Sequence, residues 1–277
     1  MKGEAMEGLK VRSVTPEEVQ FFFDNGWVKL PQLIDHTAAA DLLRRAKNVF
    51  GEDGRTGLEP ISDKAVVKVR TQGWFRTAAP ISEMDEAFHE LAVSEEMGHN
   101  AARLFGRDSS IRTTLNTLAC KLPSSDSDRG LGTDFHQDTT QHMAFDSSTL
   151  NIWIALDEVA PDMGALQFYS GSHKLGHLGD LLNPKVMEGW EPRLAQSCKK
   201  TDPIALRPGD ATVHTNLTIH GTGPNLSDRP RWSFIAMYLP ADSRFTGADS
   251  MYTNGSGLTP WTTPDLPNFP VIYKGTA

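Results

Sequence analysis

The sequence predicts a mainly β protein, an antiparallel sandwich or barrel preceded by helices. Near residue 107 the chain changes from helix-forming segments to short runs rich in β-branched and aromatic residues. Turn clusters such as "PDMG" and "RPGD" separate these runs. No internal repeat or low-complexity linker interrupts the 277 residues, so we expect one domain. Its expected parts are helical support at about 14–106, a β core at about 107–240 and a tail at 241–277.

A capping box opens the first helix. In "TPEEVQFFFDNGW", Thr15 is the expected N-cap, Pro16 takes the first helical position and Glu18 closes the box. Asn25-Gly26 ends the helix, because glycine readily adopts the left-handed conformation of a C-cap. The segment "WVKL" then predicts a short strand.

The helical character continues to Gly106. "DHTAAADLLRRAKNVFG" predicts a helix capped by Asp35 or Thr37 and ended by Gly51. "ISEMDEAFHELAVSEEMGHNAARLFG" extends the helical pattern. The helices therefore precede the β core instead of alternating with its strands.

The β core contains five runs with strand character and no helices between most of them. One long segment, "GHLGDLLNPKVMEGWEPRLAQSCKK", interrupts them and is predicted to be a lid-like insertion, because it is too long for a hairpin turn. The five runs are "SIRTTLNTLACKL", "TLNIWIALDEV", "ALQFYS", "DATVHTNLTIH" and "RWSFIAMYLP".

Composition narrows the possible partners. A formal net charge of −8 argues against nucleic acids and anionic membrane surfaces, which attract basic faces. Two cysteines cannot form a disulfide framework, and no stretch approaches the roughly 18 apolar residues that span a bilayer. The N-terminus has no apolar core typical of a secretory signal. We expect a cytoplasmic monomer or homodimer that acts on a small molecule.

Metal chemistry is indicated by "FHQDTTQH" at 135–142. In an extended strand, His136 and Asp138 project to the same side, while Gln137 points away. One further imidazole would complete a two-histidine-one-carboxylate triad, which leaves three positions of an iron ion open. The segment "HTNLTIHGTGPN" offers His214 and His220, which would share a face if they lay on one continuous strand.

His220 has the more informative context. It precedes a glycine-rich turn that allows close approach of a ligand, and Arg231 follows on the next predicted strand, where it can hold a carboxylate bidentately. Arg229 is the competing arginine, but its place in the turn favours a surface ion pair. His214 remains either a rival ligand or a neighbour of the ligands.

Together these motifs resemble the phytanoyl-CoA dioxygenase family of Fe(II)/2-oxoglutarate oxygenases. The similarity includes "HQD" at 136–138, "HGTGPN" at 220–225 and Arg231 at the family's offset. The segment at 151–173, which ends in a Gly-Ser-His turn, and the helix and strand after residue 14 are also similar. The resemblance covers most of residues 14–240.

The resemblance implies a double-stranded β-helix, or cupin-like jelly roll, braced by N-terminal helices. It implies that His136, Asp138 and His220 bind Fe(II) and form the catalytic centre, with 2-oxoglutarate and O₂ as cosubstrates. Arg231 would pair with the distal carboxylate of 2-oxoglutarate.

The resemblance also implies further residues of the cosubstrate pocket. Trp153 would line this pocket, and Thr222 would lie near the same carboxylate. Lys68 falls roughly where some members place a basic residue on the cosubstrate.

Substrate contacts are predicted from loop aromatics and one histidine, because exposed loop aromatics often mark binding sites. The candidates are Trp74, Phe75, His142 and Trp190, with Trp261 as a further loop aromatic. Solvated or packed side chains are the competing interpretation for all of them. His173 either shapes the pocket or makes local hydrogen bonds in its turn.

The expected reaction is hydroxylation of an unactivated C–H bond in a small organic substrate, with a natural product as a candidate, releasing succinate and CO₂. Desaturation, epimerisation, cyclisation and endoperoxide formation are alternatives within the same oxidative class. A zinc metallohydrolase and a non-catalytic binding protein of the same fold are the alternatives from other classes.

Overall fold

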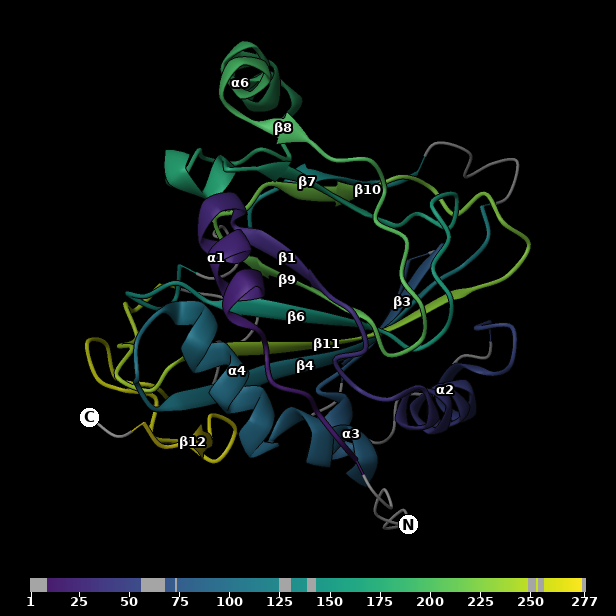
Figure 1. Ribbon diagram of the computed structural model, residues 1–277, viewed down its shortest axis with the longest axis horizontal. Helices are drawn as coiled ribbons and strands as arrows, with labels where there is room; N and C mark the ends of the chain where they lie inside the picture. Colours follow the sequence, from purple (N-terminus) through teal and green to yellow (C-terminus); the bar gives the residue numbers. More distant parts are fainter. Residues whose placement is uncertain are drawn as a thin grey trace.

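A computed structural model of the chain describes residues 9–55, 68–72, 74–124, 131–138, 143–248, 253 and 257–275. Two antiparallel sheets face each other, as the sequence predicts (Figure 1). The larger sheet has the order β1 (Trp27–Leu30), β9 (Ala211–Thr215), β6 (Leu150–Ala155), β11 (Arg231–Pro240), β4 (Ile111–Lys121), β3 (Phe75–Ala79) and β2 (Lys68–Gln72), and β12 (Val271–Tyr273) pairs with β4. The smaller sheet has the order β5 (Thr133–His136), β10 (His220–Thr222), β7 (Leu166–Ser170) and β8 (Lys199–Lys200).

The distribution of consecutive strands between the sheets makes the sandwich a jelly roll. Strands β4, β6, β9 and β11 lie in the larger sheet, and β5, β7, β8 and β10 lie in the smaller one. The chain therefore crosses repeatedly from one sheet to the other, and side chains from distant segments meet between them. This confirms the predicted double-stranded β-helix.

The helices begin and end largely where the sequence predicts. Thr15 accepts a hydrogen bond from the Glu18 amide, and the Glu18 side chain accepts one from the Thr15 amide, which forms the expected capping box. Asp35 rather than Thr37 caps the second helix. The helices are α1 (Pro16–Asn25), α2 (His36–Phe50), η1 (Ile81–Glu83), α3 (Glu86–Ala92), α4 (Glu95–Phe105), η2 (Ser172–Leu175) and α6 (Pro184–Ser197).

No helix within the described ranges is long and apolar enough to cross a membrane.

Alternation along the strands separates two cores. Ile152 and Ile154 of β6 point toward the helices and join the core on the outer face of the larger sheet. Trp153 and Ala155 point into the space between the sheets, where Phe168 of the smaller sheet joins them. Helices α2, α3 and α4 cover only the outer face, so the inner face of the sandwich is left to the functional site (Figure 1).

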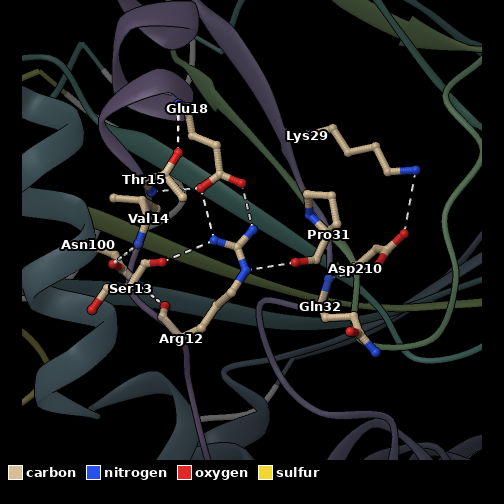
Figure 2. A network of polar contacts seen from close by, with 10 residues as sticks. All are labelled: Arg12, Ser13, Val14, Thr15, Glu18, Lys29, Pro31, Gln32, Asn100 and Asp210. Carbon is tan, nitrogen blue, oxygen red and sulfur yellow. Dashed lines mark hydrogen bonds and ion pairs between the residues drawn. The ribbon is translucent and has the colours of Figure 1, made fainter.

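The N-terminal segment is tied to the sandwich by polar contacts (Figure 2). The Arg12 guanidinium donates to both carboxylate oxygens of Glu18, at 2.8 and 2.6 Å, and to the carbonyl of Pro31 at 2.7 Å. Asn100 of α4 donates to the Arg12 carbonyl and accepts from the Val14 amide. These contacts connect α1, β1 and α4 on one side of the larger sheet.

The segment predicted to be helical at about 14–106 also contains a hairpin. Strands β2 and β3 extend the larger sheet beyond β4, with Phe75 opposite Lys121. The hairpin satisfies backbone groups that would otherwise lie at the edge of β4. The loop placement is confirmed for Trp74, which lies in the turn region of this hairpin, but is wrong for Phe75, which begins β3.

The predicted lid-like insertion instead covers the outer face of the smaller sheet. Helix α6 lies beyond β7 and β8, on the side away from the larger sheet (Figure 1). Leu194 of α6 packs in a cluster with Ile219, Phe135 and Tyr169. Phe135 precedes His136 on β5, so the cluster occupies the opposite strand face from that histidine. The insertion closes an apolar sheet face, not the space between the sheets.

We expect opposite stability effects from alanine at two glycines. Gly26 ends α1 at φ +78°, and an added Cβ would lie 2.3 Å from Nδ1 of His173. Gly26→Ala should lower the free energy of unfolding by at least about 1–2 kcal/mol. Gly189 is an exposed residue within α6 and has no atom within 4 Å of an added Cβ. Gly189→Ala should raise stability by up to about 1 kcal/mol. Urea unfolding followed by circular dichroism measures both, and equal changes would contradict the expectation.

Candidate metal centre

The ends of two paired strands bring His136 and His220 together. His136 is the last residue of β5, His220 is the first of β10, and their Cα atoms are direct partners in the sheet. Their ring centroids lie 4.5 Å apart. Asp138 follows just beyond β5 and keeps the predicted side, so that one ligand atom from each of the three residues lies within 4.8 Å of the others.

Gln137 points away from this centre, as strand alternation predicts. Its Nε2 donates to the carbonyls of Gly176 and Leu217 at 2.9 and 2.6 Å, and its Oε1 accepts from the Leu178 amide at 2.9 Å. Because Gln137 is buried and its amide makes all three bonds, the backbone between His136 and Asp138 cannot rotate freely.

Both histidines present the same nitrogen to the centre. Nδ1 of His136 lies 2.8 Å from the carbonyl of Asp134, and Nδ1 of His220 lies 3.0 Å from the carbonyl of Thr218. A carbonyl only accepts, so each Nδ1 carries the proton and each Nε2 keeps its lone pair. This tautomer is the one that a metal-binding imidazole needs.

The electrostatic environment shifts the pKa values of the two imidazoles in opposite directions. Burial, together with the nearby imidazole of His214, holds the pKa of His220 well below its ordinary value. Burial also opposes the charge on His136, but the hydrogen bond and charge of Asp138 outweigh it and raise the pKa of His136. A metal cation bound here would compete with protonation of His136. Two imidazoles and one carboxylate suit a divalent transition metal with open positions.

His214 reaches the same region from the other sheet. His214 and His220 do not lie on one continuous strand, because β9 ends at Thr215 in the larger sheet and His220 begins β10 in the smaller sheet. The rings of His214 and His220 nevertheless lie 4.1 Å apart across the sandwich. His214 does not belong to the group of three convergent ligand atoms.

Arg231 lies buried between the sheets without an acidic partner among the described residues. One terminal nitrogen donates to the carbonyl of Gly164, and Nε has no hydrogen-bond partner within the described chain. The guanidinium carbon lies 5.1 Å from the ring centroid of Trp153. Burial lowers the pKa of Arg231 to about 10, so it remains a cation at neutral pH. Arg229 instead makes surface ion pairs with Asp157 and Glu158, as expected.

Lys121 is a buried basic residue that the sequence analysis missed. It is the cross-strand partner of Arg231, is 1% exposed, and donates from Nζ to Thr222 Oγ1 at 2.6 Å and to the Gly223 carbonyl. Burial, together with the charge of Arg231, lowers the pKa of Lys121 to about 6. A lysine at an inward position of the predicted strand "SIRTTLNTLACKL" is the signal that could have identified it.

Two buried basic side chains placed side by side disfavour carrying charge together unless an anion joins them. The described part of the chain places no acid on this pair. Thr222 and Trp153 lie beside it, which is the environment that the resemblance implies for a distal carboxylate. The donor set and the orphaned Arg231 nitrogen therefore fit iron and 2-oxoglutarate.

The predicted substrate residues are dispersed. The Trp74 ring centroid lies 4.9 Å from Lys121 Nζ, and Phe75 is the strand partner of Lys121, so both lie at the carboxylate end. Trp190 lies within α6 and not in the predicted loop, packs against the outer face of the smaller sheet and donates to the Leu178 carbonyl, away from the metal centre. His142 lies outside the described residues.

The remaining predicted residues are also separate from the metal centre. Lys68 begins β2 opposite Ala79, at the other end of β3 from Phe75, and its side chain is outside the described part of the structure. Nε2 of His173 lies 3.1 Å from the carbonyl of Phe23 in α1, a long-range contact and not the expected local hydrogen bond within its turn. Trp261 is 62% exposed on the C-terminal segment.

Comparison with known proteins supports the same class of site. "Dioxygenase lolE1" of Epichloe uncinata is 24% identical over 229 residues, which cover 81% of this chain and 82% of that protein. The carbocyclase SnoK of nogalamycin biosynthesis, described as non-heme and alpha ketoglutarate dependent, shares the fold with a TM-score of 0.73 and 20% identity, over 93% of this chain and 96% of SnoK. The epimerase SnoN, solved with Fe3+, alpha ketoglutarate and nogalamycin RO, matches with a TM-score of 0.71 and 21% identity, over 92% of this chain and 97% of SnoN.

The family model for phytanoyl-CoA dioxygenase matches residues 22–233, which include every residue of the metal centre as well as Arg231 and Lys121. The chain therefore belongs to the phytanoyl-CoA dioxygenase family and is a 2-oxoglutarate-dependent non-haem iron oxygenase.

Proposed function

We propose that this oxygenase hydroxylates a C–H bond of a small organic molecule, with a natural product as the candidate class. One observation carries the proposal. Two imidazole Nε2 atoms and the Asp138 carboxylate converge between the sheets, and the buried basic side chains of Arg231 and Lys121 lie in the same space without an acidic partner among the described residues.

In this proposal His136, Asp138 and His220 hold Fe(II), and three positions remain for the cosubstrate and O₂. Bound iron would supply the oxidation of the substrate by O₂, coupled to conversion of 2-oxoglutarate into succinate and CO₂. Arg231 and Lys121 hold the distal carboxylate of 2-oxoglutarate, and Thr222 positions Lys121. Lys68 stays a second candidate for a cosubstrate contact.

The apolar residues around Trp153 exclude water from the cosubstrate. Trp153 and Phe168 are buried at 5% and 0% exposure, and Leu166 and Val159 belong to the same inner cluster. Low water content strengthens the attraction between the two cations and a carboxylate. The protein residues therefore orient the cosubstrate and keep bulk water from it.

Related outcomes of the same oxidation are the second candidate. The carbocyclase and epimerase named above share the fold, which supports keeping cyclisation and epimerisation beside hydroxylation. Desaturation and endoperoxide formation belong to the same group. A zinc metallohydrolase is disfavoured because the sequence lacks an HExxH motif and because hydrolysis leaves the buried Arg231 and Lys121 side chains without a role.

Cosubstrate turnover tests this proposal directly. With Fe(II), 2-oxoglutarate, O₂ and a panel of small metabolites, we expect succinate formation that stops under anaerobic conditions or after chelation of the metal. Mass spectrometry should show a substrate that gains one oxygen atom, whereas loss of two hydrogens would indicate desaturation. Activity that persists without O₂ and 2-oxoglutarate would favour the hydrolase, and absence of iron binding would favour the non-catalytic binding protein.

The composition supports further parts of the proposal. We propose that the chain forms one domain over residues 1–277 and acts in the cytoplasm as a monomer or homodimer, without nucleic acid. Size-exclusion chromatography with light scattering measures the oligomeric state.

A further inference from the structure

His214 is a buried imidazole beside the metal centre that has no assigned function. It is 3% exposed, and neither Nδ1 nor Nε2 has a hydrogen-bond partner in the described part of the chain. A buried polar group without a hydrogen-bond partner destabilises the folded state, because it has lost its bonds to water. Because an unpartnered imidazole is unfavourable here, its presence indicates that the adjacent metal centre requires it.

The surroundings of His214 restrict what it can serve. Its ring lies 4.1 Å from that of His220 and 5.6 Å from that of Phe168, measured between centroids. Across the sheet its Cα partners are Asn151 and Trp27. The charged atom within reach is Oδ2 of Asp138, at 3.4 Å from Nε2 of His214, which is at the limit of a hydrogen bond.

The two oxygens of Asp138 have different neighbours. Oδ2 accepts a hydrogen bond from Nδ2 of Asn151 at 2.5 Å and lies next to His214. Oδ1 faces Nε2 of His136 at 3.4 Å. Because Asn151 and His214 are direct cross-strand partners, β6 and β9 present an amide and an imidazole side by side to the same oxygen.

We propose that His214 is a positioning residue that donates its Nε2 proton to Oδ2 of Asp138. Together with Asn151 it holds this oxygen away from the metal, so that Asp138 binds through Oδ1 alone. A carboxylate held in this way occupies one metal position and leaves the others open. The inference rests on the proposed function for the identity of the metal, but concerns how this chain orients its own carboxylate.

Metal affinity gives the test a readout that does not depend on turnover. In His214→Phe, which keeps a ring but removes both nitrogens, we expect Co(II) binding to weaken by about 10- to 100-fold in calorimetric titration of the metal-free full chain. His214→Gln retains an N–H donor and should recover part of that loss. The visible absorption of Co(II) should change in the Phe variant, because a second carboxylate oxygen then reaches the metal.

Thr212→Val is the matched control. Thr212 lies on the same inner face of β9 and is fully buried, and its hydroxyl makes no hydrogen bond within the described residues, to Asp138 or to any other group. This variant should keep wild-type Co(II) affinity and spectrum. Thermal unfolding of each variant identifies any general loss of structure, and a loss of affinity that Gln does not relieve would contradict a donor role.

Wild-type affinity and spectrum in His214→Phe would overturn the proposal. A spectrum showing loss of one nitrogen ligand in that variant would also overturn it, since His214 would then bind the metal itself. Failure of the proposed function is distinguishable: a protein that binds Co(II) with the expected dependence on His214 but forms no succinate refutes the oxygenase reaction and leaves this inference intact.

Discussion

His136→Ala should yield a folded protein that retains no Fe(II) after dialysis and forms succinate only at background level. The side chain contributes one of two imidazoles, and its Nε2 faces the centre because Nδ1 is bound to the Asp134 carbonyl. Loss of a direct ligand should exceed the about 10- to 100-fold loss of metal affinity caused by changes behind a ligand. Metal analysis and succinate quantification measure the two effects.

His89→Ala provides the matched control for this change. His89 is an exposed histidine on α3, outside the metal centre. It should keep wild-type iron content and turnover, because its imidazole contributes nothing to the convergent group. Iron retention in His136→Ala at the level of this control would refute the assignment of His136 as a ligand.

Arg231→Leu should weaken the binding of 2-oxoglutarate by at least about 30-fold, because truncating one partner of a buried charge pair costs about 2–5 kcal/mol. Leucine fills part of the volume but removes the terminal guanidinium beside Trp153. Anaerobic titration of the metal-loaded protein measures the dissociation constant.

Arg229→Leu is the matched control for this effect. Its guanidinium pairs with Asp157 and Glu158 on the surface, so 2-oxoglutarate affinity should not change. Equal affinities in the two variants would place the distal carboxylate elsewhere.

The same titration has a pH dependence that reports on Lys121. Its pKa of about 6 leaves the free lysine mostly neutral at pH 7.5, whereas a bound carboxylate favours the charged form and raises the pKa. Binding should therefore take up a proton, and affinity should fall as pH rises above about 6 toward the higher pKa of the complex. Lys121→Met should remove this slope, which calorimetry in buffers of different ionisation enthalpy detects.

The local features of this protein follow from short-range chemistry in the sequence. The capping box of α1 depends on Thr15 and Glu18, which are near neighbours, and strand alternation alone predicts that Gln137 points away from His136 and Asp138. The sequence motifs around His220 and Arg231 predicted the other half of the site through their resemblance to a family. None of these inferences required knowledge of which strands pair.

Long-range pairing decided the remaining features. Lys121 becomes a neighbour of Arg231 only because β4 and β11 pair in one register, and a shift by one residue would turn it to the outer face. His214 reaches Asp138 because β9 and β6 pair in the larger sheet while His220 crosses to the smaller one. Sequence periodicity determines which side of its own strand a residue faces. Only the packing of two sheets determines what lies opposite it, because that choice depends on the combined burial of segments far apart in the chain.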